Sequence, residues 1–136
     1  MNPRGPAGGE ENEMSEKGLE MLRRLLGENR AEEVRAAWTR LSPDFAHYVT
    51  TFLAGEIWSR PRLDLKTRSL ITVAALTALG RANGLRLNIE IALNNGATKE
   101  EVLETLLQMA PYAGFPASWE GLVIADEVFR QHGGKT

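Results

Sequence analysis

Three arginines in this sequence could bind a small acid. Arg68 and Arg81 bracket the stretch 70–79, which contains no charged residue and none more polar than threonine, and Arg60 lies shortly before them. A guanidinium group binds a carboxylate through two parallel hydrogen bonds, so these residues predict a site for a carboxylated small molecule. Structural roles stay open. Arg68 and Arg81 could form salt bridges or compensate charge at a helix end, and Arg60 could contact another subunit.

Glu56 is the predicted proton donor of such a site. Its sequence neighbours are largely apolar and include Trp58. Burial among apolar side chains favours the protonated form of a carboxyl group, which can then act as an acid. The alternative is a buried Glu56 that only pairs with an arginine such as Arg68. Trp58 and Tyr112 are predicted walls of the pocket or contacts between subunits, because aromatic side chains pack more often than they react.

The composition limits the classes of function. The chain has 136 residues, 43% of them apolar and 25% charged, which is typical of one globular domain. A net charge of −2 gives no indication of a nucleic-acid surface. The chain contains no cysteine, which excludes disulfides, thiolate metal sites and thiol redox chemistry. Its histidines and acidic residues show no metal-ligand spacing, so no metal is predicted.

The apolar stretch 70–79 predicts the centre of the fold. A helix that is apolar on all sides is buried, so we expect one central helix with the others packed round it. The stretch is too short to span a membrane, which takes about 20 apolar residues. The start of the chain lacks the apolar segment of a signal peptide, so we expect a cytoplasmic protein with no membrane partner.

Helix signals elsewhere predict an all-α domain of six or seven helices. Asp64 is the predicted N-cap of the central helix, and Ser42, followed by a proline, opens an earlier one. Thr98 and Glu101 have the spacing of a capping box. Residues 1–14, rich in glycine, proline and glutamate, predict a disordered tail before a domain over residues 15–132.

Five motifs in order resemble the carboxymuconolactone decarboxylase family. The resemblance covers roughly residues 19–129, although no single motif is specific by itself. The motifs are GEIWSRP at 55–61, TRSL at 67–70, ALGR at 78–81, ALNNGATKEE at 92–101 and YAGFPAS at 112–118.

This resemblance implies an all-α fold of the alkylhydroperoxidase D-like type, assembled as a homo-oligomer, commonly a trimer or hexamer. It also implies a lyase that converts 4-carboxymuconolactone to the β-ketoadipate enol-lactone without a cofactor, in the catabolism of aromatic compounds. Other members of the superfamily are peroxidases that use a Cys-x-x-Cys pair. An approximate alignment places Arg81 and Gly84 at those cysteine positions, and a chain without cysteine cannot carry out that reaction.

Asn88 occupies the position where the resembled decarboxylases usually have a histidine. Asparagine cannot transfer a proton, but it can orient a substrate or stabilise an oxyanion. We therefore predict Glu56, Arg81 and Asn88 as catalytic residues, with Glu56 as the proton donor. Contacts to the substrate are predicted for four further side chains, those of Arg60, Arg68, Trp58 and Tyr112.

Two functions remain open from the sequence. In the first, the substrate loses CO2 from a carbon conjugated to the lactone carbonyl, and the resulting dienolate is protonated two carbons away. Arginines would hold the substrate carboxylates, and no metal is needed because the lactone accepts the electrons. In the second, the chain is a non-catalytic family member that binds a small acidic metabolite or acts as an oligomeric accessory protein, as the asparagine at position 88 suggests.

Overall fold

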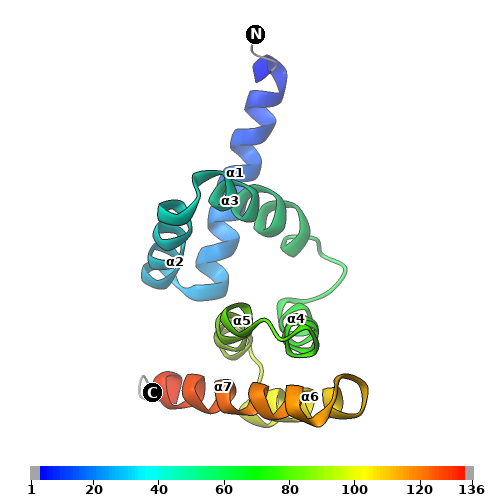
Figure 1. The fold of residues 1–136 in the computed structure, drawn as a ribbon. Helices are drawn as coiled ribbons and strands as arrows, with labels where there is room; N and C mark the ends of the chain where they lie inside the picture. The colour runs from blue at the N-terminus through cyan, green and yellow to red at the C-terminus, as the bar shows by residue number, and fades with distance from the viewer. Residues whose placement is uncertain (1–3, 134–136) are drawn as a thin grey trace. The chain divides into compact units, whose positions relative to one another are not determined.

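The computed structural model describes residues 4–133, and its regular secondary structure is entirely helical (Figure 1). No strand occurs within these residues, so the predicted all-α fold is confirmed. None of the helices in this range combines the length and the apolar character needed to cross a bilayer. Contacts divide the chain into two compact units, Met1–Arg62 and Leu63–Thr136, which we call the N-terminal and the C-terminal unit.

The N-terminal unit consists of three α-helices and a π-helix. The elements are α1 (Arg4–Leu26), α2 (Glu28–Leu41), α3 (Pro43–Tyr48) and η1 (Val49–Trp58). The sequence predicts a disordered tail over residues 1–14, but helix α1 already includes residues 4–14. Glutamates favour a helix, and a proline is tolerated in its first turn. Residues 1–3 lie outside the described residues, and the limits 15–132 of the domain stay a prediction.

Two glycines allow α1 and η1 to meet backbone to backbone. A Cβ atom built on Gly18 would lie 1.8 Å from the carbonyl oxygen of Thr50, and one built on Gly55 would lie 2.6 Å from that of Met14. Both distances are shorter than any side chain permits, so the crossing requires glycine at each position. The π-helical hydrogen-bond pattern of η1 was not predicted, since the sequence indicated an ordinary helix here.

The C-terminal unit is a two-layer bundle of four α-helices. Helices α4 (Leu65–Leu79) and α5 (Ala82–Asn94) form one layer, and α6 (Lys99–Ala113) and α7 (Phe115–Gly133) form the other (Figure 1). The helices of one layer run across those of the other. Apolar side chains from all four helices make the core, which includes Val73, Leu85, Ile89, Val102, Leu106, Ile124 and Val128.

Capping side chains fix where these helices begin. The Asp64 carboxylate accepts a hydrogen bond from the backbone N–H of Thr67 at 2.7 Å, and α4 ends at Gly80 with φ 71°. Thr98 and Glu101 form the predicted capping box, with bonds of 3.0 and 2.9 Å. The predicted caps at Ser42, Asp64 and Thr98 are all confirmed.

Helix α4 is the predicted central helix, and in the single chain it is buried along one face. Ser69, Val73 and Thr77 are buried, whereas Ile71 and Leu79 are 53% and 61% exposed. A helix with apolar residues on all of its faces can be covered on every face. The sequence does not indicate which faces are covered within the chain itself.

Candidate functional site

Two of the predicted substrate-binding arginines lie near opposite ends of α4. Arg68 is half-buried in the first turns of α4, where its backbone N–H donates to the carbonyl of Asp64 at 3.0 Å. Arg81 is exposed and is the N-cap residue of α5, directly after Gly80. The left-handed conformation of Gly80 turns the chain from α4 into α5 and so determines where Arg81 lies.

Asn88 is half-buried on α5, and its amide already has a partner within the helix. The Nδ2 atom donates to the carbonyl oxygen of Gly84, one turn earlier, at 2.9 Å. Arg86 on the same helix pairs with Glu127 of α7 at 2.7 Å. The bond to Gly84 holds the Asn88 side chain against its own helix, which suits an orienting role. An amide group does not transfer protons, so this role does not include acid–base catalysis.

Tyr112, the fourth predicted site residue of the C-terminal unit, is 78% exposed near the end of α6. Phe115 and Trp119, which follow on α7, are 69% and 71% exposed. The Tyr112 ring is therefore largely uncovered in the single chain, and its predicted role as a pocket wall stays a prediction. Its predicted alternative role, as a contact between subunits, stays open because this group of aromatic side chains is uncovered.

Glu56, Trp58 and Arg60 lie in the N-terminal unit. Glu56 is exposed on η1, so the burial expected for it from its apolar sequence neighbours is wrong in the single chain. The reason is that the apolar side chains near it, such as Phe52, face outward with it. Trp58 is buried at the end of η1, 8% exposed, and Arg60 is exposed in the following turn.

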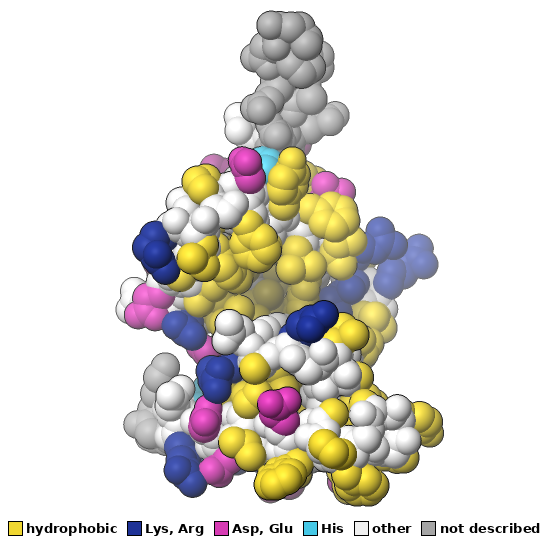
Figure 2. Space-filling model, viewed as in Figure 1, with side chains coloured by type: hydrophobic (Ala, Val, Ile, Leu, Met, Phe, Trp, Pro, Cys, Tyr) yellow, Lys and Arg dark blue, Asp and Glu magenta, His cyan; other side chains and the backbone are white. Residues whose placement is uncertain are grey.

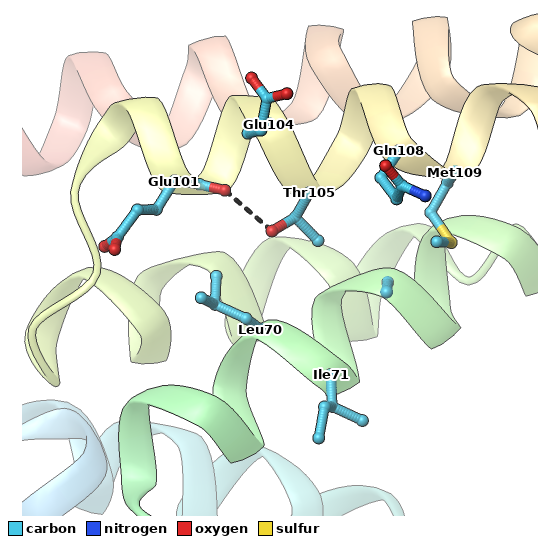
Figure 3. Close-up of a pocket in the computed structure, with 8 residues that line it drawn as sticks. Leu70, Ile71, Glu101, Glu104, Thr105, Gln108 and Met109 are labelled. Carbon is cyan, nitrogen blue, oxygen red and sulfur yellow. Dashed lines mark hydrogen bonds between the residues drawn. The ribbon is translucent and has the colours of Figure 1, made fainter.

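An open groove lies between α4 and α6 (Figure 3). The sequence did not predict it. It encloses about 470 Å³ and has an apolar floor that includes Leu70, Ala74 and Met109. Figure 3 shows the side chain of Glu104 pointing away from α4, so its carboxylate lies at the rim. The only sequence signal for the groove is that apolar positions recur three to four residues apart on two neighbouring helices, which equally describes an ordinary packing contact.

The charges at this groove do not fit an anionic substrate. Glu101 and Glu104 are its ionisable lining residues. Glu101 binds Lys66 at 2.8 Å, and this bond, together with the backbone N–H of Thr98, lowers the pKa of the Glu101 carboxyl. The groove thus offers an anionic ligand no cationic lining side chain, while the Glu101 charge is already paired with Lys66. None of the predicted site residues lines it.

Among the residues whose side chains the structure describes, no three histidine or acidic side chains come close enough together to hold a metal ion. The structure places Arg68, Arg81, Asn88 and Tyr112 in the C-terminal unit and the remaining three predicted residues in the N-terminal unit. The roles assigned to all seven stay predictions.

Known proteins similar to this chain include two decarboxylases. The sequence profile of the carboxymuconolactone decarboxylase family matches residues 43–127. A 4-carboxymuconolactone decarboxylase of Acinetobacter baylyi is 41% identical over 117 residues, which cover 86% of this chain and 87% of that protein. A 15.0 kDa protein from the nqo9–nqo10 intergenic region of Paracoccus denitrificans is 34% identical, with 88% and 90% covered. A nitrosuccinic acid decarboxylase of Metarhizium robertsii is 29% identical, with 82% and 78% covered.

Proposed function

Because the chain belongs to the carboxymuconolactone decarboxylase family, we propose that it is a carboxy-lyase that decarboxylates 4-carboxymuconolactone or a related carboxylated lactone. The observation that carries this proposal is the 41% identity to a 4-carboxymuconolactone decarboxylase over most of both chains. The proposed place of the reaction is the catabolism of aromatic acids in the cytoplasm.

The proposed reaction needs charge stabilisation and one proton. The bond between the substrate carbon and its carboxylate breaks, CO2 leaves, and the electron pair moves into the conjugated lactone to give a dienolate. A proton then adds two carbons away, so substrate anion plus proton gives CO2 plus enol-lactone. Cationic and hydrogen-bonding groups that face the developing negative charge lower the barrier, and the lactone carbonyl accepts the electrons without a cofactor.

The predicted residues divide between these tasks. Arg60 and Arg68 would bind the substrate carboxylates, while Arg81 would stabilise the dienolate oxygen. Asn88, held by its bond to Gly84, would orient the lactone. Glu56 would supply the proton, since a carboxyl group can act as a general acid once water is excluded from it.

The direct test is turnover of 4-carboxymuconolactone by the purified protein. We expect the ultraviolet absorbance of the lactone to fall and one equivalent of CO2 to be released. Arg81→Ala should lower kcat by about 100-fold or more, as the loss of one group that stabilises an oxyanion does. Arg130→Ala, an exposed arginine on α7, is the matched control and should be fully active. A folded wild-type protein that leaves the lactone unchanged would exclude this substrate.

The same assay includes nitrosuccinic acid, because a relative is named for its decarboxylation. A nitro group, like a lactone carbonyl, can accept the electron pair that decarboxylation releases. Turnover of nitrosuccinic acid alone would keep the carboxy-lyase and change the substrate. Failure with both acids, combined with binding of either one in a calorimeter, would favour the non-catalytic alternative, which the engaged amide of Asn88 also fits.

We also propose that the chain forms a homo-oligomer, a trimer or a hexamer. Ile71, Leu79, Phe115 and Trp119 are each more than half exposed in the single chain. Apolar surface on this scale is typical of a protein–protein interface. Light scattering should give a multiple of the 15.0 kDa chain mass, and a monomer at micromolar concentration would contradict the proposal.

A further inference from the structure

We propose that Asn95 and Gly96, in the turn that follows α5, form a site of spontaneous deamidation that converts Asn95 to an aspartate or an isoaspartate. The pair belongs to the motif at 92–101, to which the proposed function gives no role. All the contacts involved lie within the C-terminal unit. The reaction needs no substrate and no second copy of the chain, and it does not depend on the proposed decarboxylation.

Deamidation joins the side chain of an asparagine to the backbone nitrogen that follows it. The Gly96 nitrogen would attack Cγ of Asn95, and the new C–N bond would close a five-membered succinimide. The bond from Cγ to Nδ2 breaks, and the amide group leaves as ammonia with the proton of the Gly96 N–H. Water then opens the ring at either carbonyl, so asparagine and water give an acid and ammonia. Glycine favours the attack because it has no side chain to hinder it.

The Gly96 nitrogen is available for this attack. Within the described part of the chain no acceptor bonds its N–H, whereas the N–H groups on both sides of it are bonded. The Asn95 N–H donates to the carbonyls of Ile91 and Ala92, both at 3.1 Å. The Ala97 N–H donates to the same Ala92 carbonyl at 3.0 Å. A backbone N–H without an acceptor loses its proton to base more readily, and the deprotonated nitrogen is the form that attacks.

The turn leaves Gly96 room to move. Gly96 is exposed with φ 105°, and a Cβ atom built on it would meet only Cδ of Lys66, at 3.9 Å. Closure of the ring rotates the Asn95–Gly96 peptide and breaks the bond from the Ala97 N–H. It also breaks the bond that Asn95 Nδ2 donates to the Ile91 carbonyl at 2.8 Å. Both bonds lie at the end of α5, where opening requires little free energy.

A second asparagine–glycine pair, Asn83 and Gly84, lies near the start of α5. A Cβ atom built on Gly84 would lie 3.2 Å from the Leu76 side chain of α4, so the backbone here is packed against the neighbouring helix. Rotation of this peptide would disturb a contact between two helices. We therefore expect Asn83 to react more slowly than Asn95, although both are followed by glycine.

Modification of Asn95 would weaken the end of α5. Its Nδ2 donates to the Ile91 carbonyl, and a carboxylate would place an oxygen against that carbonyl instead. The new negative charge would also lie at the C-terminus of a helix, where the helix dipole disfavours anions. Lys66, whose stem lies beside Gly96, has its ammonium group paired with Glu101 at 2.8 Å. An isoaspartate would in addition lengthen the backbone before the capped start of α6.

The effect of the added charge should be local. Figure 2 shows acidic and basic side chains interspersed among hydrophobic ones on the visible face of the C-terminal unit. One further carboxylate changes the net charge of the chain, −2, by one unit and does not create a large field of one sign. Any loss of stability should therefore arise at the end of α5.

The first test follows the reaction by mass spectrometry in the folded, full-length protein. The protein is incubated at mildly alkaline pH, and trypsin then releases Asn83 within residues 82–86 and Asn95 within residues 87–99. Asn95 should gain the mass difference between an amide and an acid about tenfold faster than Asn83, a factor that corresponds to about one hydrogen bond. A sample digested without incubation gives the background.

Two controls separate the effect of the structure from that of the sequence. In urea both pairs lose their surroundings, so Asn83 and Asn95 should react at similar rates. Asn94 lies in the same peptide as Asn95, and the N–H that follows it is bonded, so Asn94 should remain an amide in the folded protein. Equal rates at Asn83 and Asn95 in the folded protein, or an Asn95 that reacts only in urea, would overturn the inference.

The second test measures the consequence with two matched variants. N95D and N83D add the same charge at opposite ends of α5. N95D should lower Tm, whereas N83D should leave it unchanged or raise it, because the N-terminus of a helix favours an anion. Wild-type protein that has been converted at Asn95 should lose at least as much Tm as N95D. A Tm of N95D equal to that of the wild type would overturn the predicted weakening of α5.

Discussion

The two units of the chain achieve close packing by opposite means. In the C-terminal unit, large side chains fill the space between helices, and the largest fully buried ones of the described residues all belong to it: Ile89, Leu106, Val73, Val102, Thr77 and Ser69. In the N-terminal unit, the tightest approach lies at Gly18 and Gly55, where side chains are absent. One unit therefore depends on the volume of its side chains and the other on glycines at a helix crossing.

The comparison extends to the predicted site residues. Arg68, Arg81 and Asn88 lie on or beside helices that are capped and regular, so their backbone positions follow from ordinary helix geometry. Glu56 lies on a π-helix that packs against α1 through Gly55. The position of Glu56 therefore depends on the less regular part of the chain. Such π-helices are rare and frequently occur at functional sites.

Leu106→Ala should cause the largest loss of stability, because Leu106 is completely buried in the C-terminal core. Removing its side chain leaves a cavity, and the free energy of unfolding should fall by about 4 kcal/mol. Urea denaturation followed by circular dichroism gives this value. Leu107→Ala is the control, since the neighbouring leucine is 55% exposed and should change stability little. Equal effects of the two variants would show that side-chain volume does not determine this unit.

Gly18→Ala should cause the second-largest loss of stability, and the loss should be in the N-terminal unit. The added methyl group would lie 1.8 Å from the Thr50 carbonyl oxygen, a backbone atom that cannot move aside without moving η1. Overpacking of this kind costs about 3 kcal/mol. Hydrogen exchange read by mass spectrometry should show faster exchange in α1 and η1.

Two other glycines are matched controls for Gly18→Ala. Gly9 lies on the same helix with no atom near its added methyl group, so Gly9→Ala should be neutral or slightly stabilising. At Gly121 the added methyl would lie 2.9 Å from the end of the Leu106 side chain, which is a side-chain atom and not part of the backbone. Gly121→Ala should therefore cost less than Gly18→Ala. The reverse order would refute the contrast between backbone and side-chain packing.

The same contrast explains which features could be predicted from the sequence. Asp64, Thr98 and Glu101 are local signals, since each caps a helix within three residues, and all three were predicted correctly. The crossing at Gly18 is a contact between residues 32 positions apart, as 50 − 18 gives, and an isolated glycine in a helical pattern does not indicate its partner. The exposure of Glu56 was missed for a related reason, because apolar neighbours in sequence predict burial only where another element covers them.

A comparison of Thr50→Val with Thr51→Val should separate the contributions of two neighbouring η1 hydroxyls to the stability of the fold. The Thr50 hydroxyl is buried, and within the described part of the chain no hydrogen-bond partner reaches it. The Thr51 hydroxyl donates to the carbonyl of His47. Removing the first should leave stability unchanged or raise it, while removing the second should lower it by about 1 kcal/mol. Thermal unfolding measures both, and a clear loss in Thr50→Val would show that its hydroxyl is bonded in solution.

Acid should weaken one identified contact in the C-terminal unit, with a smaller effect than Leu106→Ala, Gly18→Ala or Thr51→Val. The bonds from Lys66 and from the backbone N–H of Thr98 lower the pKa of Glu101 below the 4.5 of an ordinary glutamate. A lowered pKa stabilises the fold at pH values above 4.5, and this contribution is lost as the pH falls through the lower folded value.

Glu101→Gln removes this dependence and serves as its test. The difference in Tm between wild type and E101Q should therefore be largest near neutral pH and should shrink below about pH 4.5. Glu104→Gln is the control, because Glu104 lies one turn later on α6 and is exposed, so its effect should be smaller at every pH. Hydrogen exchange should place the acid-induced loss at the start of α6 and leave α1 and η1 unchanged, because no part of their glycine contact ionises. A loss of protection in α1 and η1 over the same pH range would show that the two units do not respond independently.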